Sequence, residues 1–355
     1  MDLFSDKNIM KILMIGLGSV GQRHLRNIRR LYGEQVEINA YRVRGLQRTF
    51  SDDMKIREGI ELDTEFNIHV FTDLDEALAN KPDIVFISNI TAKHAECAVK
   101  AARAGCDIFL EKPVSDSLEY IDELAQIVKE KGIIVYVGYQ NRHHPCISDI
   151  CKAIEKENIG RIISVHSEFS ERISTMHTYE DYKDTYMARK NMGGGPILNL
   201  QIHCLDYLQM LFGTPVSVSA VGGNSGIAGL DVEDHVASVY CFKENDGRSI
   251  PVYAYTDFYQ YPPVHTLKVV CENGRIEADF NKAETRIIQE NSEKKIEHSD
   301  FVRNDMFIAE LEEFVDCVAN KKKTASDLEQ GIVGLKMALS AKKSVANGGR
   351  REQIC

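Results

Sequence analysis

A mainly apolar segment near the middle of the chain carries three polar side chains that could do chemistry. Residues 197–211 (ILNLQIHCLDYLQML) are dominated by Ile and Leu, with Asn199, His203 and Asp206 among them. At about 100° per residue, an α-helix places these three within one narrow stripe, with Tyr207 beside them. One strip of the expected helix therefore faces polar groups while the rest faces apolar core. A histidine in that strip could exchange a proton near neutral pH; for an isolated residue, a buried structural histidine is the alternative.

A second candidate is the glycine pattern Gly16-x-Gly18-x-x-Gly21, which lies between an expected strand and an expected helix. In this context the first glycine makes the turn, the second lets the backbone approach a pyrophosphate, and the third packs helix on strand. The helix N-terminus offers N–H groups and a positive dipole to phosphate. The pattern favours a dinucleotide site over a glycine-rich turn without a ligand. The residues expected to hold the cofactor here are Gly16, Gly18, Ser19, Val20 and Gly21.

The end of the next expected strand bears on the type of dinucleotide. An NAD site usually has Asp or Glu about 20 residues past the glycines, bound to the ribose 2′-hydroxyl. The chain instead reads AYRVRG, with Arg42 and Arg44 and no acid. Guanidinium groups can bind a 2′-phosphate through charge-assisted hydrogen bonds. We therefore expect NADP as the preferred cofactor, with NAD possible; two solvated arginines at a strand end are the alternative.

A lysine at the end of a third apolar strand completes the set of chemical candidates. Lys112 follows residues 107–111, at the edge where open parallel sheets bind ligands. Desolvation and the cation of an oxidised nicotinamide would lower the pKa of such a lysine. Pro113 fixes the turn after it. A surface lysine at a strand end is the alternative reading.

The elements that must position these residues change in kind near Arg142. Before it, short apolar runs alternate with helical patterns, which predicts a doubly wound parallel sheet, the α/β Rossmann class. After it, strand-like stretches dominate and two helices close the chain, which predicts an α+β domain with a large, mostly antiparallel sheet. We expect a dinucleotide-binding domain over residues 1–142 and a substrate-binding and oligomerisation domain over residues 143–355.

Composition excludes several classes of function. The chain has 355 residues, 43% of them hydrophobic, and a net charge of −10, which argues against nucleic acid or an anionic membrane as partner. Nine dispersed cysteines, without a CxxC pair or a zinc-type histidine spacing, predict reduced thiols and no metal site. The first eleven residues lack the basic start and apolar run of a secretory signal, and no stretch is long enough to cross a bilayer. We expect a cytoplasmic protein.

Taken together, the motifs resemble those of the glucose–fructose oxidoreductase and inositol dehydrogenase family (Gfo/Idh/MocA). The resemblance runs from about residue 11 to residue 349 and includes the Rossmann glycines, a strand ending in Glu111-Lys112-Pro113, and a helix that bears His203 after glycines 193–195. It implies that the lysine and the histidine line the substrate pocket beside the nicotinamide, and that the Lys112–Pro113 bond is cis. It also implies cofactor contacts by Asn89, Thr91, His94, Glu111 and Lys112, and a place beneath the pocket for residues 138–141, with Asn141 near the substrate.

The expected reaction is alcohol–ketone interconversion. His203 would take the hydroxyl proton while hydride passes to the nicotinamide, and Lys112 would hydrogen-bond the reacting oxygen. The family often has Asp four residues before this histidine, where this chain has Asn199, whose amide can position a group but cannot stabilise an imidazolium by charge. Asp206 is the candidate substitute; pairing with a cation elsewhere is its alternative.

Rings and cations precede the glycines and indicate the substrate class. Aromatic faces suit sugar or base stacking, and arginine suits phosphate or carboxylate, so we expect a sugar or nucleotide-linked amino sugar, as the resemblance also implies. The residues expected to contact it are Lys112, Asn141, Tyr182, Tyr186, Arg189, Asn199 and His203. Two alternatives remain: a redox-assisted glycosidase with tightly held nicotinamide, and a non-catalytic NAD(P)-binding sensor or partner protein. A homo-oligomer, dimer or tetramer, is expected from the large sheet.

Overall fold

The computed structural model describes residues 9–45, 48–51, 55–244 and 246–354. It divides into two units: residues 1–139 with 307–332, and residues 140–306 with 333–355. The expected boundary near residue 142 lies close to this division, whereas residues 307–332, expected in the second domain, belong to the first unit. Among the described residues, no helix is long and apolar enough to span a membrane.

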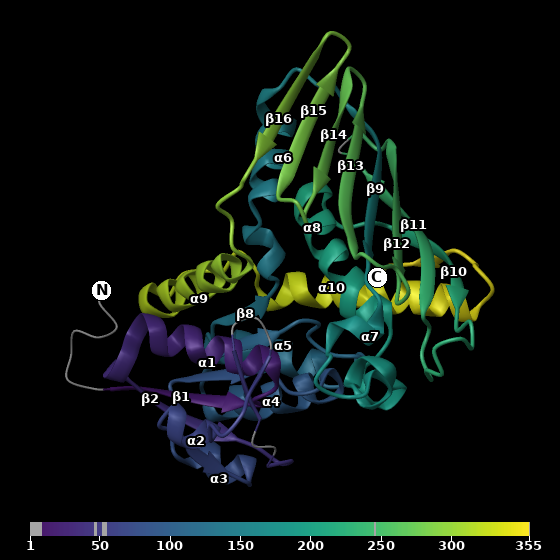
Figure 1. The fold of residues 1–355 in the computed structure, drawn as a ribbon. Coiled ribbons are helices and arrows are strands. Elements are labelled where there is room, and N and C mark those ends of the chain that lie inside the picture. The colour runs from purple at the N-terminus through teal and green to yellow at the C-terminus, as the bar shows by residue number, and fades with distance from the viewer. Residues whose placement is uncertain (1–8, 46–47, 52–54, 245, 355) are drawn as a thin grey trace. The chain divides into compact units, whose positions relative to one another are not determined.

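The first unit contains a six-stranded parallel sheet in the order β5-β2-β1-β6-β7-β8 (Figure 1). Its strands β6, β7 and β8 are fully buried and mainly apolar, as expected for a parallel sheet covered on both faces. The strands are β1 (Met10–Ile15), β2 (Val36–Tyr41), β5 (His69–Phe71), β6 (Ile84–Ile87), β7 (Asp107–Glu111) and β8 (Val135–Gly138); β3 (Thr49–Phe50) and β4 (Ile56–Arg57) form a separate pair.

Helices connect these strands. They are α1 (Ser19–Tyr32), α2 (Leu62–Glu65), α3 (Leu74–Ala79), α4 (His94–Ala104) and α5 (Ile121–Lys131). Helix α9 (Arg303–Asn320) adds Leu311, Phe314 and Val318 to the apolar core formed by α1 and the strands. The distant segment therefore completes the Rossmann unit rather than extending the second one.

The second unit contains a nine-stranded sheet in which only the β9–β12 pair is parallel among the described strand pairs. The order is β16-β15-β14-β13-β9-β12-β11-β10-β17, and Figure 1 shows these strands fanning side by side. Their bounds are β9 (Ile162–Ser170), β10 (Ser217–Gly223), β11 (His235–Lys243), β12 (Ser249–Asp257), β13 (Val264–Cys271), β14 (Gly274–Asp279), β15 (Glu284–Gln289), β16 (Ser292–Glu297) and β17 (Glu352–Gln353). Both fold-class expectations are confirmed; β16 and β17 are strands that the sequence pattern did not indicate.

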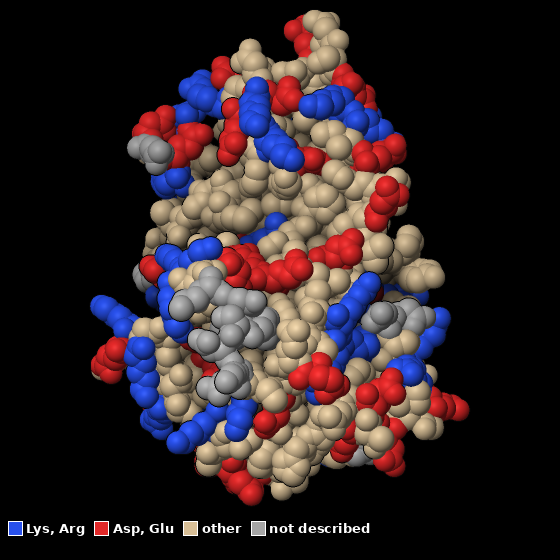
Figure 2. Space-filling model, turned by 90° about the vertical axis from the view of Figure 1, so that its left-hand side faces the viewer, with Lys and Arg blue, Asp and Glu red and all other residues tan. Residues whose placement is uncertain are grey.

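Helices of the second unit pack on this sheet: α6 (Pro145–Lys156) contacts β14 and β15, and α8 (Ile202–Phe212) contacts β9. Buried and exposed residues alternate along β11 and β12, as in a sheet with one covered face. Short helix α7 (Ile173–Met176) follows β9, and α10 (Leu328–Ala346) closes the chain before β17. On the face drawn in Figure 2, Lys and Arg are interspersed with Asp and Glu, without an extended basic field.

Candidate active site

Three candidate residues follow three neighbouring strands of the parallel sheet. Gly16 follows β1, Asn89 stands two residues after β6, and Lys112 follows β7 directly. Because β1, β6 and β7 are adjacent and parallel, these residues lie at one edge of the sheet. The strand order also reverses between β1 and β6, which is where open α/β sheets bind nucleotides.

Gly16, Gly18 and Gly21 at this edge of the sheet are each glycine for a different structural reason. Gly16 has φ +89°, and a Cβ there would lie 2.7 Å from the Asn89 backbone. A Cβ on Gly21 would lie 2.4 Å from the Gly16 carbonyl oxygen, so this glycine permits close packing of α1 on the turn. A Cβ on Gly18 would meet nothing within 4 Å, and this residue precedes α1 without a side-chain cap. Open space at a helix N-terminus fits a pyrophosphate, so the residues present fit the dinucleotide.

The loops after β6 and β7 are joined by a histidine. The ring nitrogens of His94 lie 2.8 Å from the Pro113 carbonyl oxygen and 3.1 Å from the Asn89 carbonyl oxygen. Burial lowers the pKa of His94, against the opposing effect of these two carbonyls. The Asn89 amide donates to Cys97 Sγ, while its buried oxygen accepts no hydrogen bond among the described residues. Thr91 is buried in the short turn between Asn89 and His94. Asn89, Thr91 and His94 together therefore shape the loops beside the glycine turn.

Glu111 shapes the turn that presents Lys112. Its carboxylate lies 2.7 Å from His24 Nε2 and accepts the backbone N–H of Lys112 at 3.3 Å. The Lys112–Pro113 peptide bond is cis, as the family resemblance implied. The Glu111 side chain, expected among the cofactor contacts, is thus engaged with α1 and with its own turn.

The two arginines after β2 have different surroundings. Arg42 is buried, and its guanidinium donates to the Asp63 carboxylate at 2.8 Å. Arg44 is exposed. Asp63, 21 residues further along, is a partner that the local pattern could not indicate. Arg44 is therefore the more accessible of the two cations.

In the second unit, the helix bearing His203 begins with a π-helical turn, Ile197–Gln201, followed by α8. The Ile202 N–H donates to the Ile197 carbonyl, so the α-helical stripe calculated for Asn199 does not hold before Ile202. Insertions of this kind often occur at functional sites. The Asn199 amide donates to the Gly195 carbonyl at 2.8 Å and so holds the preceding glycine turn.

The glycine turn at residues 193–195 is closely packed. A Cβ on Gly194 would lie 2.6 Å from the Met187 carbonyl oxygen, and one on Gly195 would lie 2.3 Å from the Glu233 carboxylate. Lys342 donates to both oxygens of Glu233, at 2.9 and 3.0 Å. This ion pair closes over the turn that leads into the π-helical segment.

His203 is 5% exposed and lies beside a stack of three rings, of which His265 and Phe280 are buried and Phe169 is partly buried. Its ring centroid is 5.8 Å from that of Phe169, which stacks on His265 at 4.1 Å; His265 in turn stacks on Phe280 at 4.2 Å. Burial lowers the pKa of His265 to about 3, so this ring is neutral at physiological pH. His203 therefore packs on the side of Phe169 in a stack of uncharged rings.

Asp206 pairs with Arg142, the second of the two alternatives foreseen for it. The Arg142 Nε donates to both carboxylate oxygens at 2.8 and 3.1 Å, and Nη2 also donates to Oδ1. Both side chains are buried, at 6% and 2% exposed. The carboxylate is taken up by a structural ion pair, and its proposed use as the acid partner of His203 loses its support.

The aromatic and cationic candidates before the glycines lie in a run of short 3₁₀ turns. Tyr182 and Tyr186 pack against an apolar cluster that includes Leu200 of the π-helical turn. Tyr182 also donates to the Ala228 carbonyl at 3.2 Å. Arg189 is partly buried and pairs with Asp184. Asn141 is buried in a 3₁₀ turn after β8.

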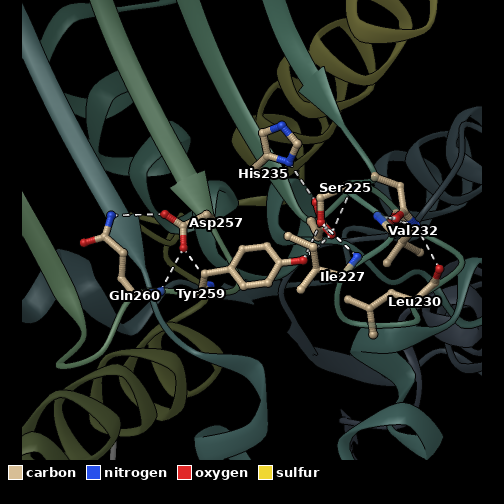
Figure 3. Close-up of polar contacts among 11 residues, drawn as sticks. Ser225, Ile227, Leu230, Val232, His235, Asp257, Tyr259 and Gln260 are labelled. Carbon is tan, nitrogen blue, oxygen red and sulfur yellow. Dashed lines mark hydrogen bonds and ion pairs between the residues drawn. The ribbon is translucent and has the colours of Figure 1, made fainter.

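Two polar clusters were missed by sequence reasoning. In the loop between β10 and β11, the buried Asp234 carboxylate accepts hydrogen bonds from Ser225, Tyr259 and His235, at 2.6, 2.6 and 2.8 Å. Figure 3 shows the Tyr259 ring pointing toward Ser225, while the backbone N–H groups of Tyr259 and Gln260 donate to Asp257 at the end of β12. This loop also holds Asp231, which accepts the Lys190 N–H at 2.6 Å, so it anchors the segment before the glycine turn. The sequence signal that could have indicated this cluster is a single acidic residue at a strand end, Asp234 before β11 and Asp257 at the end of β12.

The second missed cluster lies in the first unit. His24, Glu111 and Glu310 are all buried and have polar atoms within 4.8 Å of one another. Their positions in the chain, 24, 111 and 310, gave no local signal.

Comparisons with known proteins agree with this geometry. Residues 10–139 match the model of the Gfo/Idh/MocA oxidoreductase family, NAD-binding Rossmann fold, and residues 147–277 match the family's C-terminal domain. The myo-inositol 2-dehydrogenase of Thermotoga maritima is 24% identical over 355 residues, 95% of this chain and 96% of that protein. The D-xylose dehydrogenase of Paenarthrobacter nicotinovorans is 31% identical over 151 residues, 42% of this chain and only 39% of that protein.

Among solved structures, a levoglucosan dehydrogenase in complex with NADH aligns with a TM-score of 0.82 at 17% identity, covering 98% of this chain and 99% of that one. At this identity the likeness concerns the fold. The two matched family models together cover most of the chain, in the order that its two units follow. The chain therefore belongs to the Gfo/Idh/MocA family of oxidoreductases, with an NAD-binding Rossmann fold followed by the family's C-terminal domain.

Proposed function

We propose that this protein is an NAD(P)-dependent dehydrogenase that interconverts a hydroxyl and a ketone on a sugar or a nucleotide-linked amino sugar. Family membership and the sugar and polyol relatives support the reaction class. The observation that carries the proposal is the shared sheet edge of Gly16, Asn89 and Lys112, at the strand-order reversal.

The dinucleotide, when bound, supplies the hydride acceptor or donor. In this proposal Gly16, Gly18 and Gly21 form the turn that admits the pyrophosphate, and the first-turn N–H groups of Ser19 and Val20 bind it. The loop residues Asn89, Thr91 and His94 line the adjoining part of the cofactor site, supported by the unsatisfied buried oxygen of Asn89.

The proton chemistry is assigned to two residues. In the oxidation direction His203 accepts the proton of the substrate hydroxyl as the C–H hydride leaves, and Lys112 donates a hydrogen bond to the same oxygen. Asn199 acts through its hydrogen bond to the Gly195 carbonyl, which sets the geometry of the helix start. Asp206 has no step in this scheme.

The preference for NADP is part of the proposal and rests mainly on Arg44. No acid stands at the end of β2, and Arg44 is exposed there, whereas Arg42 is paired with Asp63. An exposed guanidinium favours a 2′-phosphate over a bare 2′-hydroxyl.

The remaining substrate contacts and the assembly are also proposed. Tyr182, Tyr186, Arg189 and Asn141 supply ring faces and polar groups for a carbohydrate. The described cysteines are all free, which agrees with the reducing cytoplasm.

Self-association is proposed through the sheet face that carries three exposed apolar residues on adjacent strands. Val221 on β10, Val239 on β11 and Tyr253 on β12 are 59%, 48% and 38% exposed, and Val239 lies directly opposite Tyr253. A contiguous apolar patch of this kind favours pairing with a second copy as a dimer or tetramer.

A screen of sugars, polyols and nucleotide sugars with NADP and NAD, read by reduced-nicotinamide absorbance, tests the function. Once a substrate is found, His203→Ala lowers turnover by about a hundredfold or more, while His298→Gln, a histidine of the same unit that bonds Asp149, leaves it unchanged. Unchanged turnover in His203→Ala would remove this residue from the mechanism. Product without net absorbance change would indicate the glycosidase alternative, and cofactor binding without any turnover would indicate the sensor.

A further inference from the structure

Helix α9 brings a buried acid into the core of the first unit. Glu310 is 0% exposed, and neither of its carboxylate oxygens accepts a hydrogen bond among the described residues. Its neighbours are His24 on α1 and Glu111 at the end of β7, with polar atoms within 4.8 Å of one another. His24 Nε2 faces Glu111, while Nδ1 has no partner among the described groups.

The surroundings do not favour two ionised carboxylates. The His24 ring lies 4.8 to 6.0 Å from the rings of Phe109, Phe86 and Phe307, so the cluster is walled by aromatic side chains. An ionised carboxylate left unpaired in such a site is costly, and such groups become neutral instead.

The described charged groups around the cluster come from several elements of the first unit. Arg23 lies over the Phe307 ring at 4.9 Å, and Glu313 accepts hydrogen bonds from Tyr136 and the Ala325 N–H. The titratable and charged groups that face the cluster from the elements around it are Arg23 and His24 of α1, Glu111 and Lys112 at the end of β7, His94 of α4, Tyr136 of β8 and Glu313 of α9.

A proton fits the cluster better than a cation does. His24 Nε2 and Glu111 Oε1 are 2.7 Å apart, which is a hydrogen-bond distance. Two ligands bound to one zinc-like cation, each at about 2.0–2.2 Å, would lie roughly 3 Å or more apart.

We propose that Glu310 holds a proton at neutral pH and shares it with Glu111, so that His24, Glu111 and Glu310 form a proton-bridged brace between α1, β7 and α9. Glu111 also accepts the Lys112 N–H, so Glu310 acts as a positioning residue for the Lys112 turn. Burial raises the pKa of Glu310 well above 4.5, and the neighbouring Glu111 and Glu313 raise it further. The link to Lys112 rests on the proposed function; the proton itself does not.

Folding stability measured against pH tests the brace. Because the folded pKa of Glu310 exceeds its unfolded value, the folded state binds the extra proton, and stability falls as pH rises from about 4.5 through the folded pKa. Glu310→Gln keeps the shape and removes this titration. The unfolding constant of the wild type relative to Glu310→Gln should therefore rise by up to about tenfold per pH unit across this range. Glu312→Gln, an exposed acid on the same helix, should follow the wild type; equal pH dependence in all three proteins overturns the proposal.

Infrared spectroscopy detects the proton directly, without substrate or cofactor. At pH 7 the wild type and Glu312→Gln should show a protonated-carboxyl C=O band that Glu310→Gln lacks. Should Glu310→Gln fail to fold, Glu310→Met provides the same subtraction with an apolar side chain. Spectra identical with and without Glu310 overturn the proposal, as does a wild-type melting temperature that falls on chelation and recovers with Zn²⁺, which would place a cation in the cluster. Failure of the substrate screen leaves both measurements valid.

Discussion

Replacing Asp206 with asparagine separates a structural role of this residue from a catalytic one. In the structure the Asp206 carboxylate receives three hydrogen bonds from Arg142, and both side chains are almost fully buried. Asp206→Asn keeps the volume but leaves the guanidinium charge in a buried site without its counter-charge. Breaking a buried pair in this way costs about 3–5 kcal/mol of folding free energy. A residue that served only as the acid partner of His203 would instead lose turnover at nearly unchanged stability.

Urea denaturation followed by circular dichroism measures this cost, since the chain has no tryptophan. The control is the double variant Asp206→Leu with Arg142→Met, which replaces both charges by apolar groups of similar size and should recover most of the lost stability. The coupling energy is the stability loss of this double variant minus the losses of Asp206→Leu alone and Arg142→Met alone. A loss below about 1 kcal/mol in Asp206→Asn, together with a large fall in turnover, would refute the structural assignment.

Three further predictions concern the cofactor and the assembly. Gly18→Ala adds a Cβ to open space, so thermal stability should stay close to that of the wild type while dinucleotide affinity, measured by titration calorimetry, falls about tenfold or more; equal affinity would show that the pyrophosphate does not approach Gly18. Arg44→Ala should weaken NADP binding by about 1–3 kcal/mol and leave NAD binding unchanged, and equal losses for both cofactors would contradict the 2′-phosphate assignment. Val239→Lys places a charge in the exposed apolar patch and should lower the particle mass measured by light scattering. The control Lys268→Ala, on β13 of the same sheet, should leave this mass unchanged. An unchanged mass in Val239→Lys argues for a different interface.

The sequence predicted the elements whose evidence is periodic. Mainly apolar runs of four to six residues marked β1, β6 and β7, and the glycine spacing marked the turn into α1, because both signals are local. Alternation of apolar and polar residues marked β11 and β12 in the same way. Local signals weakened where the chain departs from ideal periods, as in the π-helical turn, where the stripe calculated for Asn199 assumed α geometry.

Pairings between distant residues were not predictable. Asp206 was weighed as a catalytic acid, and only the structure shows Arg142, 64 residues earlier, bonded to it. Arg42 was expected to contact the cofactor phosphate, and its hydrogen bond to Asp63, 21 residues later, had no local signal. The hydrogen bond from Tyr182 to the Ala228 carbonyl, 46 residues later, likewise had no local signal. The type of a residue indicates which chemistry it can perform, but its hydrogen-bond partner depends on which distant segments the fold brings beside it.

Composition, the glycine turn and the strand that ends in Glu111-Lys112-Pro113 determined the class of fold, the dinucleotide cofactor and the family, because each depends on residues close together in the chain. Tertiary structure alone decided which charged side chains form ion pairs with each other, as Arg142 and Asp206 do, and which stay accessible to a ligand. The return of α9 to the first unit, which buries Glu310 beside Glu111, is the clearest case, because no local pattern records that residues 111 and 310 share one apolar core.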